Sequence, residues 1–253
     1  MFLLEGRALV KSRIIISKKV HLRNPILIEG LPGMGFVANL SAKYLIQKLK
    51  AEKFAEVFTP HFQDMAVASS NGVPRLPTNE LYFWASGELK RDLIILDGNT
   101  QALTVFGQYE LSGKILDFAQ ELGCNFIICL GGLKRENLAS STQLYGTFTD
   151  LETLTEVRRY GVAVMEGKIY GMAGLLLGLA SHRNMRGFCL LAETLGTYPD
   201  AEAAKDVIAF LMEYLGFHVD LTELDDASND VVKVLELLGR TDVKKVEGVF
   251  SRF

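Results

Sequence analysis

Apolar residues in the first part of the chain change from a continuous run to helical spacing. Residues 25–29 read Pro-Ile-Leu-Ile-Glu, and the next six residues contain Gly30, Gly33 and Gly35. Apolar positions from Val37 to Leu49 then recur every three or four residues. This order predicts a buried strand, a tight loop and a helix.

The same order recurs further along the chain. Residues 93–96 and 126–130 are apolar runs that end at Asp97-Gly98-Asn99 and at Gly131-Gly132, with a helix predicted over 109–122 between them. Buried strands that alternate with helices favour right-handed crossovers between parallel strands. The sequence therefore predicts a three-layer α/β fold, a mainly parallel sheet with helices on both faces.

Shorter elements are predicted around these units. Residues 65–73 and 80–86 favour two short strands that extend or flank the main sheet. The later elements are a helix over 150–159, a strand at 162–164, a helix over 171–180, a strand at 188–191, and a helix that begins after Asp200 and ends at Gly216.

The chain changes character near residue 220, where an acidic stretch follows the last core helix. We therefore expect an α/β core domain over 1–219 and a small C-terminal helical extension over 220–253, with a helix at 230–238. Phe250 and Phe253 lie in the tail and are flanked by charge, which predicts an arm that binds a partner. The alternative is a short helix folded back on the core.

Composition excludes several classes of function. The chain has 253 residues, of which 49% are hydrophobic, so it can bury a substantial core. Its formal net charge is −3, which offers no basic field for nucleic acid. The basic run 11–23 alternates with isoleucines at 14–16, which is typical of a strand with a solvated edge.

Location is predicted from the cysteines and the apolar runs. The three cysteines lack paired spacing and read as reduced, intracellular residues. The first residues, Met-Phe-Leu-Leu-Glu, do not resemble a signal peptide, and no apolar run approaches the roughly 20 residues that span a membrane. We expect a cytoplasmic protein without a membrane partner.

The glycine loop resembles two nucleotide-binding motifs without completing either. Residues 33–38 fit the dinucleotide fingerprint GxGxxA, but the candidate second strand, 54–58, does not end in the acid that would bind ribose. Gly30 and Gly35 have Walker spacing, but Phe36 and Val37 replace the lysine and the hydroxyl that a triphosphate needs. The structural alternative is that the glycines permit positive φ and close packing of helix on strand.

A cleft is predicted where the strands end, since ligands gather at the carboxyl ends of parallel strands. Its candidate residues are Gly30, Gly33, Gly35, Asp97, Asn99, Gln101, Gly131 and Gly132. The alternative is ordinary turn chemistry, in which the Asp and Asn side chains bond to nearby backbone. The four histidines are scattered and no GxSxG motif occurs, so we expect no metal, no cofactor and no catalytic residues.

Several blocks resemble the proteasome assembly chaperone family in sequence and in order. They are 29–38 (EGLPGMGFVA), 76–82 (LPTNELY), 92–101 (DLIILDGNTQ), 147–150, 171–176 and 191–196, and the resemblance extends over about residues 25–220. Asp97 departs from the family pattern, which often has Thr there. The chain also ends Ser-Arg-Phe, without the hydrophobic-Tyr-any tripeptide by which some members dock.

The resemblance implies a core related to the nucleoside phosphorylase/hydrolase architecture, a homo-oligomer, and ATP-independent assistance in assembling the proteasome. The expected partners are proteasome α-subunits or a second chaperone of the same family. A second hypothesis is an enzyme or a small-molecule or nucleotide-binding protein that uses the predicted cleft. A third is a structural oligomer whose partner is another member of its family.

Overall fold

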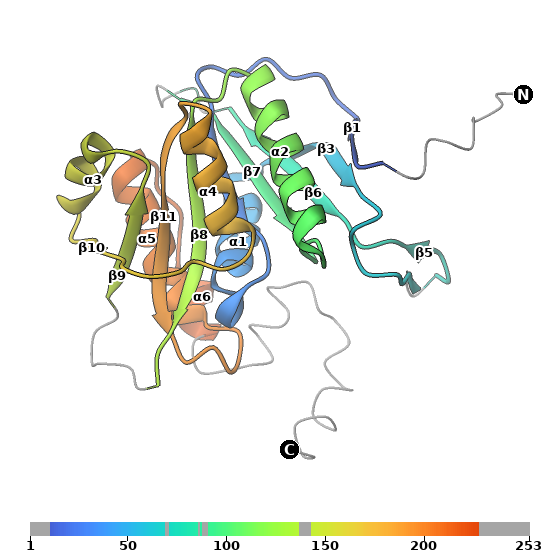
Figure 1. Cartoon of the computed structure of the whole chain (residues 1–253). Coiled ribbons are helices and arrows are strands. Elements are labelled where there is room, and N and C mark those ends of the chain that lie inside the picture. The colour runs from blue at the N-terminus through green and yellow to red at the C-terminus, as the bar shows by residue number, and fades with distance from the viewer. Residues whose placement is uncertain (1–10, 69–70, 86, 88–90, 137–142, 228–253) are drawn as a thin grey trace, which may run out of the picture.

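A single large sheet forms the centre of the molecule, with helices on both sides (Figure 1). The computed structural model describes residues 11–68, 71–85, 87, 91–136 and 143–227. Within these residues the sheet has nine strands in the order β1-β3-β6-β7-β2-β8-β11-β9-β10. Their bounds are β1 Arg13–Ile16, β2 Ile26–Gly30, β3 Glu52–Phe58, β6 Asn79–Trp84, β7 Leu93–Gly98, β8 Phe126–Lys134, β9 Leu144–Phe148, β10 Ala163–Val164 and β11 Arg186–Thr194.

The sheet is mixed, which corrects the prediction of a mainly parallel one. The four central strands β7, β2, β8 and β11 are parallel to one another. Strands β1, β3 and β6 add an antiparallel half, and β9 runs antiparallel to β11 and parallel to β10. The connection from β6 to β7 is too short for the crossover that parallel strands require, so these two strands pair as a hairpin.

Helices cover both faces of the sheet, as the periodicity predicts. Helices α1 (Val37–Leu49), α3 (Leu151–Arg158), α5 (Ala201–Leu215) and α6 (Thr222–Ala227) pack on one face. Helices α2 (Val105–Glu121) and α4 (Met172–His182) pack on the other, in front of the sheet in Figure 1. Two apolar cores result, one on each face, because the central strands are buried on both sides.

Helix ends follow the expected capping chemistry. The Asp200 carboxylate accepts a hydrogen bond from the backbone N–H of Ala203 at 2.9 Å, and Gly216 ends α5 at a φ of 78°. Helix α2 begins four residues before its predicted start, at Val105, because the Thr104 hydroxyl accepts from the N–H of Gly107 at 3.0 Å.

The predicted strand over 65–73 is wrong. In its place, β4 (Val67–Ala68) and β5 (Pro74–Arg75) form a separate two-stranded ribbon that projects from the main sheet (Figure 1). Pro74 and Pro77 lack the N–H groups that a longer ladder would need. The ribbon and its flanks leave four large apolar side chains exposed: Met65, Val67, Val73 and Leu76.

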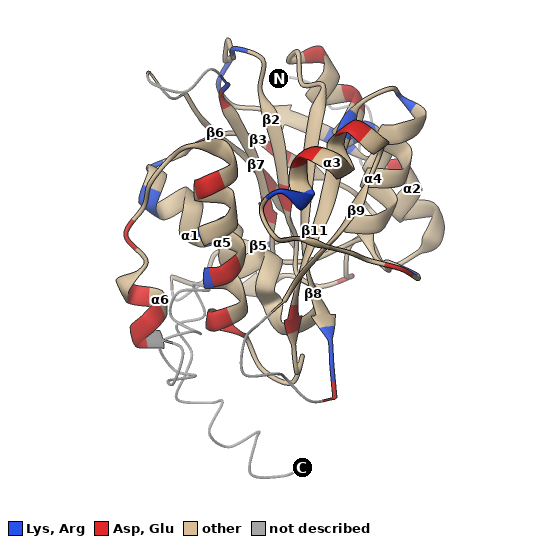
Figure 2. Ribbon diagram, turned by 90° about the vertical axis from the view of Figure 1, so that its left-hand side faces the viewer, with Lys and Arg blue, Asp and Glu red and all other residues tan. Residues whose placement is uncertain are grey.

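The C-terminal helices carry an acidic outer surface. Acidic residues lie along α5 and α6 in Figure 2. Helix α6 packs against α5 through Leu224, which is buried in the core, and residues 228–253 lie outside the described part of the chain. The predicted helix at 230–238 falls there, and the domain boundary at residue 220 stays a prediction.

Among the described helices, none is long and apolar enough to cross a membrane.

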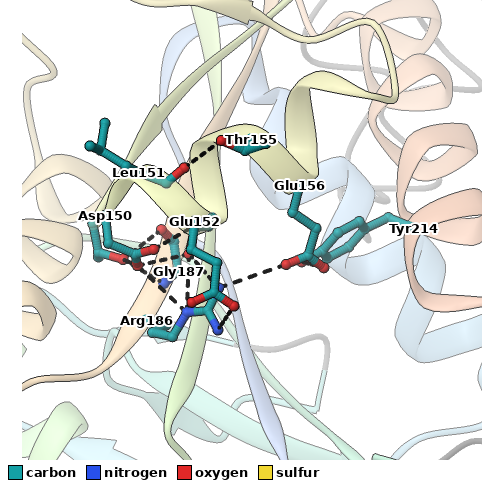
Figure 3. Close-up of polar contacts among 10 residues, drawn as sticks. Asp150, Leu151, Glu152, Thr155, Glu156, Arg186, Gly187 and Tyr214 are labelled. Atoms are coloured by element: carbon teal, nitrogen blue, oxygen red, sulfur yellow. Dashed lines mark hydrogen bonds and ion pairs between the residues drawn. The ribbon is translucent and has the colours of Figure 1, made fainter.

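Arg186, at the amino end of β11, forms ion pairs with α3 and reaches α5 indirectly through Glu156, which lies 3.8 Å from its guanidinium (Figure 3). Its guanidinium lies 3.0 Å from the Glu152 carboxylate and 3.6 Å from that of Asp150, both near the start of α3. Glu156 of the same helix accepts a hydrogen bond from the Tyr214 hydroxyl of α5 at 3.0 Å. This polar network fixes α3 at the end of the sheet opposite the glycine loop.

Candidate functional site

Six of the eight residues of the predicted cleft divide between two pockets on opposite faces of the sheet, while Gly30 and Gly35 line neither pocket. Side chains alternate along a strand, so Gly30 of β2 and Asp97 of β7, which are register partners, face α1. Glu29 and its register partner Leu96 face α2 and α4. The prediction of one cleft is therefore wrong, because neighbouring positions at the strand ends point in opposite directions.

The pocket on the α1 face, which we call the α1-side groove, has a volume of about 970 Å³ and holds Asp97 and Asn99. Asp97 accepts a hydrogen bond from the side-chain amide of Asn39 at 2.6 Å and forms an ion pair with Lys43 at 2.9 Å. Burial raises the pKa of Asp97, while Lys43 opposes the shift. Asn99 accepts a hydrogen bond from the backbone N–H of Thr78 at 3.0 Å, which joins two segments that are distant in sequence and is not the local turn chemistry named above as the alternative.

The charges along this groove are matched to one another. Lys53 of β3 forms ion pairs with Glu56, at 2.9 Å, and with Glu80 of β6. The Tyr82 hydroxyl donates to Glu80 at 2.6 Å, and burial together with that carboxylate raises the pKa of Tyr82. The network links β3 to β6 on the face of the antiparallel half of the sheet that α1 borders.

The pocket on the opposite face, which we call the Glu29 pocket, has a volume of about 430 Å³. It contains four of the predicted residues, namely Gly33, Gln101, Gly131 and Gly132, together with Glu29. Gln101 closes one side, since its amide donates to the Pro32 carbonyl at 2.7 Å and accepts from the N–H of Met172 at 2.9 Å. These bonds join the glycine loop to the start of α4.

Glu29 is the buried polar residue of this pocket that sequence reasoning missed. Its side chain is 1% exposed, its Oε1 accepts from the backbone N–H of Leu31 at 3.0 Å, and its Oε2 has no partner among the described residues. Burial raises the pKa of Glu29 to about 8, against the opposing effect of the N–H groups of Leu31 and Leu130. The available signal was a lone acid at the end of an otherwise apolar strand.

The glycine loop packs against the ends of β8 and β11. Gly35 has a φ of 59°, and a Cβ there would lie 2.6 Å from the Thr194 hydroxyl oxygen. A Cβ at Gly30 would overlap that of Ala42 in α1. Gly33 differs, since its φ is −154° and a Cβ would meet nothing within 4 Å, so the expectation of a constrained Gly33 is wrong.

The dinucleotide interpretation also fails on topology. The fingerprint needs a second strand beside the first, but β2 pairs with β7 and β8. Strand β3, which contains residues 54–58, is separated from β2 by β6 and β7. The described residues also contain no group of three or more side chains that could hold a metal ion.

An exposed apolar surface lies at the start of α2. Val105 is 76% exposed and Phe106 is 72% exposed, and Leu103 and Tyr109 beside them are exposed as well. We call these four residues the α2 patch. The sequence did not single them out, because their spacing is compatible with a buried helix face. Phe250 and Phe253, the predicted partner-binding residues, lie outside the described residues.

This architecture defines an α/β protein with a mixed sheet, a tightly packed glycine loop and a small buried-acid pocket. The model of the PAC2 family matches residues 27–238, and the chain belongs to the PAC2 family. The resemblance to the proteasome assembly chaperone family is thus confirmed.

Three similar proteins cover nearly the whole chain. An uncharacterized protein of Methanocaldococcus jannaschii is 34% identical over 94% of this chain and 93% of its own. The crystal structure of Pyrococcus furiosus PbaB, an archaeal proteasome activator, has a TM-score of 0.83 and 37% identity, with 90% of this chain and 99% of that one covered. Pyrococcus furiosus PbaA, an archaeal homolog of proteasome-assembly chaperone, has a TM-score of 0.74, with 92% of this chain and 99% of that one covered. The two sequences are 24% identical, so this likeness shows a shared fold.

Proposed function

We propose that this protein binds the proteasome, through its α-subunits or through a second chaperone of the same family, and that it does so without ATP. The observation that carries the proposal is the 37% identity to PbaB, an archaeal proteasome activator, across 90% of this chain and 99% of that one. Identity at this level over almost the full length supports a related use of the same fold.

The surface of the chain supports a binding role. In the α2 patch, the consecutive residues Val105 and Phe106 are each more than 70% exposed. The projecting ribbon around β4 and β5 adds further exposed apolar residues. Clustered apolar surface is unfavourable in water and is typical of protein contact sites, whereas single exposed apolar residues need no explanation.

The glycine loop supports independence from ATP. Phe36 and Val37 occupy the positions of the lysine and hydroxyl that would meet the phosphates and Mg²⁺. Two backbone N–H groups of the loop that could otherwise donate to a phosphate are used within the chain. The N–H of Leu31 donates to the Glu29 carboxyl group at 3.0 Å, and the N–H of Phe36 donates to the Gly33 carbonyl at 3.0 Å.

The test is association with purified proteasome components. The full chain is mixed with mature 20S proteasome and, separately, with free α-subunits, and complexes are detected by native mass spectrometry with and without ATP. Binding to the mature particle with faster peptide hydrolysis indicates an activator. Binding to free α-subunits with faster ring formation indicates an assembly chaperone. The proposal is wrong if neither component binds with a dissociation constant of about 10 μM or less, which corresponds to a binding free energy of roughly −7 kcal/mol, and if no proteasome subunit is recovered with the chain from the native lysate.

A further inference from the structure

The Glu29 pocket contains an unsatisfied polar atom that the proposed proteasome role leaves unexplained. Oε2 of Glu29 is fully buried and has no hydrogen-bond partner among the described residues. A buried polar group without a partner is unfavourable, because it has lost its hydrogen bonds to water and gained none in the protein. Such a cost is typical of functional sites, where a ligand supplies the missing partner.

The protonation state of Glu29 determines what it can bind. Because burial raises its pKa to about 8, the carboxyl group is mostly protonated at neutral pH. A protonated carboxyl offers one O–H donor beside its acceptor oxygens. Neutral polar groups, such as a hydroxyl or a carbonyl, can therefore satisfy Glu29 without placing an unpaired charge in the core.

The walls of the pocket are mainly apolar. Leu31, Met165 and Leu191 line it, and Met34 of the glycine loop lies beside them. Its volume of about 430 Å³ lies within the range of sites for small organic ligands, roughly 300–1,000 Å³. A ligand that fills it needs an apolar body between its polar ends.

The exposed rim of the pocket carries two lysines. Lys134 at the end of β8 and Lys168 before α4 line it with exposed side chains, and neither forms an ion pair with another described residue. Two lysines near one mouth attract an anion and oppose a cation. The pocket is thus polar and neutral at its buried end, apolar along its walls and cationic at its mouth.

We propose that the Glu29 pocket binds a small organic acid whose apolar body lies between Leu31 and Met165, whose distal hydroxyl or carbonyl bonds to Glu29, and whose acid group faces Lys134 and Lys168. This site is separate from the α2 patch and from the proteasome contacts proposed above. Its failure would leave that proposal untouched.

A matched set of probes tests each end of the ligand. The first probe is 3-(4-hydroxyphenyl)propionate, the second is 3-phenylpropionate, which lacks the distal hydroxyl, and the third is 3-(4-hydroxyphenyl)propylamine, which reverses the charge. Binding to the full chain is followed by NMR of 13C-labelled methionine methyl groups. Met34 and Met165 line the pocket, while Met65 and Met212 lie elsewhere and serve as internal controls.

The expected result is a saturable shift of the Met34 and Met165 signals with the hydroxy acid, while those of Met65 and Met212 stay in place. Loss of the distal hydroxyl should weaken binding about fivefold, the worth of one hydrogen bond. The amine should bind more weakly than the acid. Probe concentrations up to about 5 mM suffice, because ligands this small bind with at most modest affinity and millimolar dissociation constants are expected.

Variants assign the effects to residues. Glu29→Leu should remove the preference for the hydroxyl, and Glu29→Gln, which keeps a donor, should retain it. The double variant Lys134→Gln/Lys168→Gln should weaken binding of the acid at least about threefold. Lys11→Gln/Lys19→Gln, which alters two exposed lysines beside β1, is the matched control and should bind as the wild type does.

Three results would overturn the proposal. One is the absence of any saturable shift at Met34 or Met165 with the hydroxy acid. Another is tighter binding of the amine than of the acid, which would assign the site to cations. The third is an unchanged hydroxyl preference in folded Glu29→Leu, which would show that Glu29 does not contact the ligand.

Discussion

Glu29 and Asp97 lie one register position apart on the hydrogen-bonded strands β2 and β7, yet their side chains project from opposite faces of the sheet. Asp97 is compensated by Lys43 and Asn39 in an open groove. Glu29 is enclosed in an apolar core, and none of the described residues places a cation beside it. Two carboxyl groups at the ends of neighbouring strands therefore have different chemistry, because one faces α1 and the other faces α2 and α4.

The first prediction concerns the pH dependence of stability at Glu29. Its pKa rises from 4.5 to about 8 on folding, so between these values the folded state retains a proton that the unfolded state has lost. Stability from this group is complete below pH 4.5 and falls by about 1.4 kcal/mol per pH unit as pH rises towards 8. Glu29→Gln should remove this slope, and chemical denaturation from pH 5 to 8 measures it.

Two thiols face Glu29 and do not obscure this measurement. Burial, together with the carboxyl group, raises the pKa of Cys129 and Cys189, so both stay neutral over the same pH range. Glu166→Gln alters an exposed acid and is the control, whose slope should match that of the wild type. An equal slope in Glu29→Gln and wild type would mean that Glu29 is ionised in the fold.

Periodicity alone predicted the central strands, their helices and the caps at Asp200 and Gly216. These features are local, since an apolar run of strand length or a helix with one apolar face is encoded within a dozen residues. Strand order and direction depend on pairings between distant residues, which is why the antiparallel half of the sheet was missed. The predicted relation to the nucleoside phosphorylase architecture stays a prediction.

The prediction of a single cleft went wrong for a related reason. The correct residue types were found at the strand ends, but alternation sends Gly30 and Asp97 to one face and Glu29 to the other. The register that decides this is invisible in a single sequence. Glu29 carried a signal in its position at the end of an apolar run, whereas the α2 patch carried none, because exposed and buried helix faces share the same spacing.

The second prediction contrasts two glycines of one loop. Gly35→Ala should lower the free energy of unfolding by about 1–3 kcal/mol, because its φ of 59° is strained for a side chain and the new Cβ would lie 2.6 Å from the Thr194 hydroxyl oxygen. Gly33→Ala should change it by less than about 0.5 kcal/mol, since the added Cβ meets nothing. Denaturant titration of both variants checks the contrast, and similar losses at the two positions would refute it.

The third prediction concerns the tail, whose residues lie outside the described part of the chain. Deleting residues 240–253 should leave the melting temperature within a few degrees while weakening association with α-subunits or a partner chaperone. The motivation is the sequence alone, with Phe250 and Phe253 as aromatic anchors that are worth about 2 kcal/mol or more each at interfaces. Phe250→Ala/Phe253→Ala in the full chain separates the anchors from tail length. A large loss of stability with intact binding would mean that the tail belongs to the core.

The last prediction is that the chain forms a homo-oligomer through the α2 patch. We expect a homo-oligomer at micromolar concentration, because Val105 and Phe106 place apolar side chains in water that a second copy can cover. Phe106→Glu should shift the mass measured by light scattering towards the monomer, since a buried unpaired charge at an apolar contact is strongly unfavourable. Leu151→Glu is the matched control: Leu151 is 80% exposed but stands at the start of α3, apart from the α2 patch. If the wild type is already a monomer, or if both variants keep its mass, the α2 patch does not hold copies of this chain together. If Phe106→Glu becomes a monomer and still associates with the proteasome, the contacts between copies and the contacts with the partner use different surfaces.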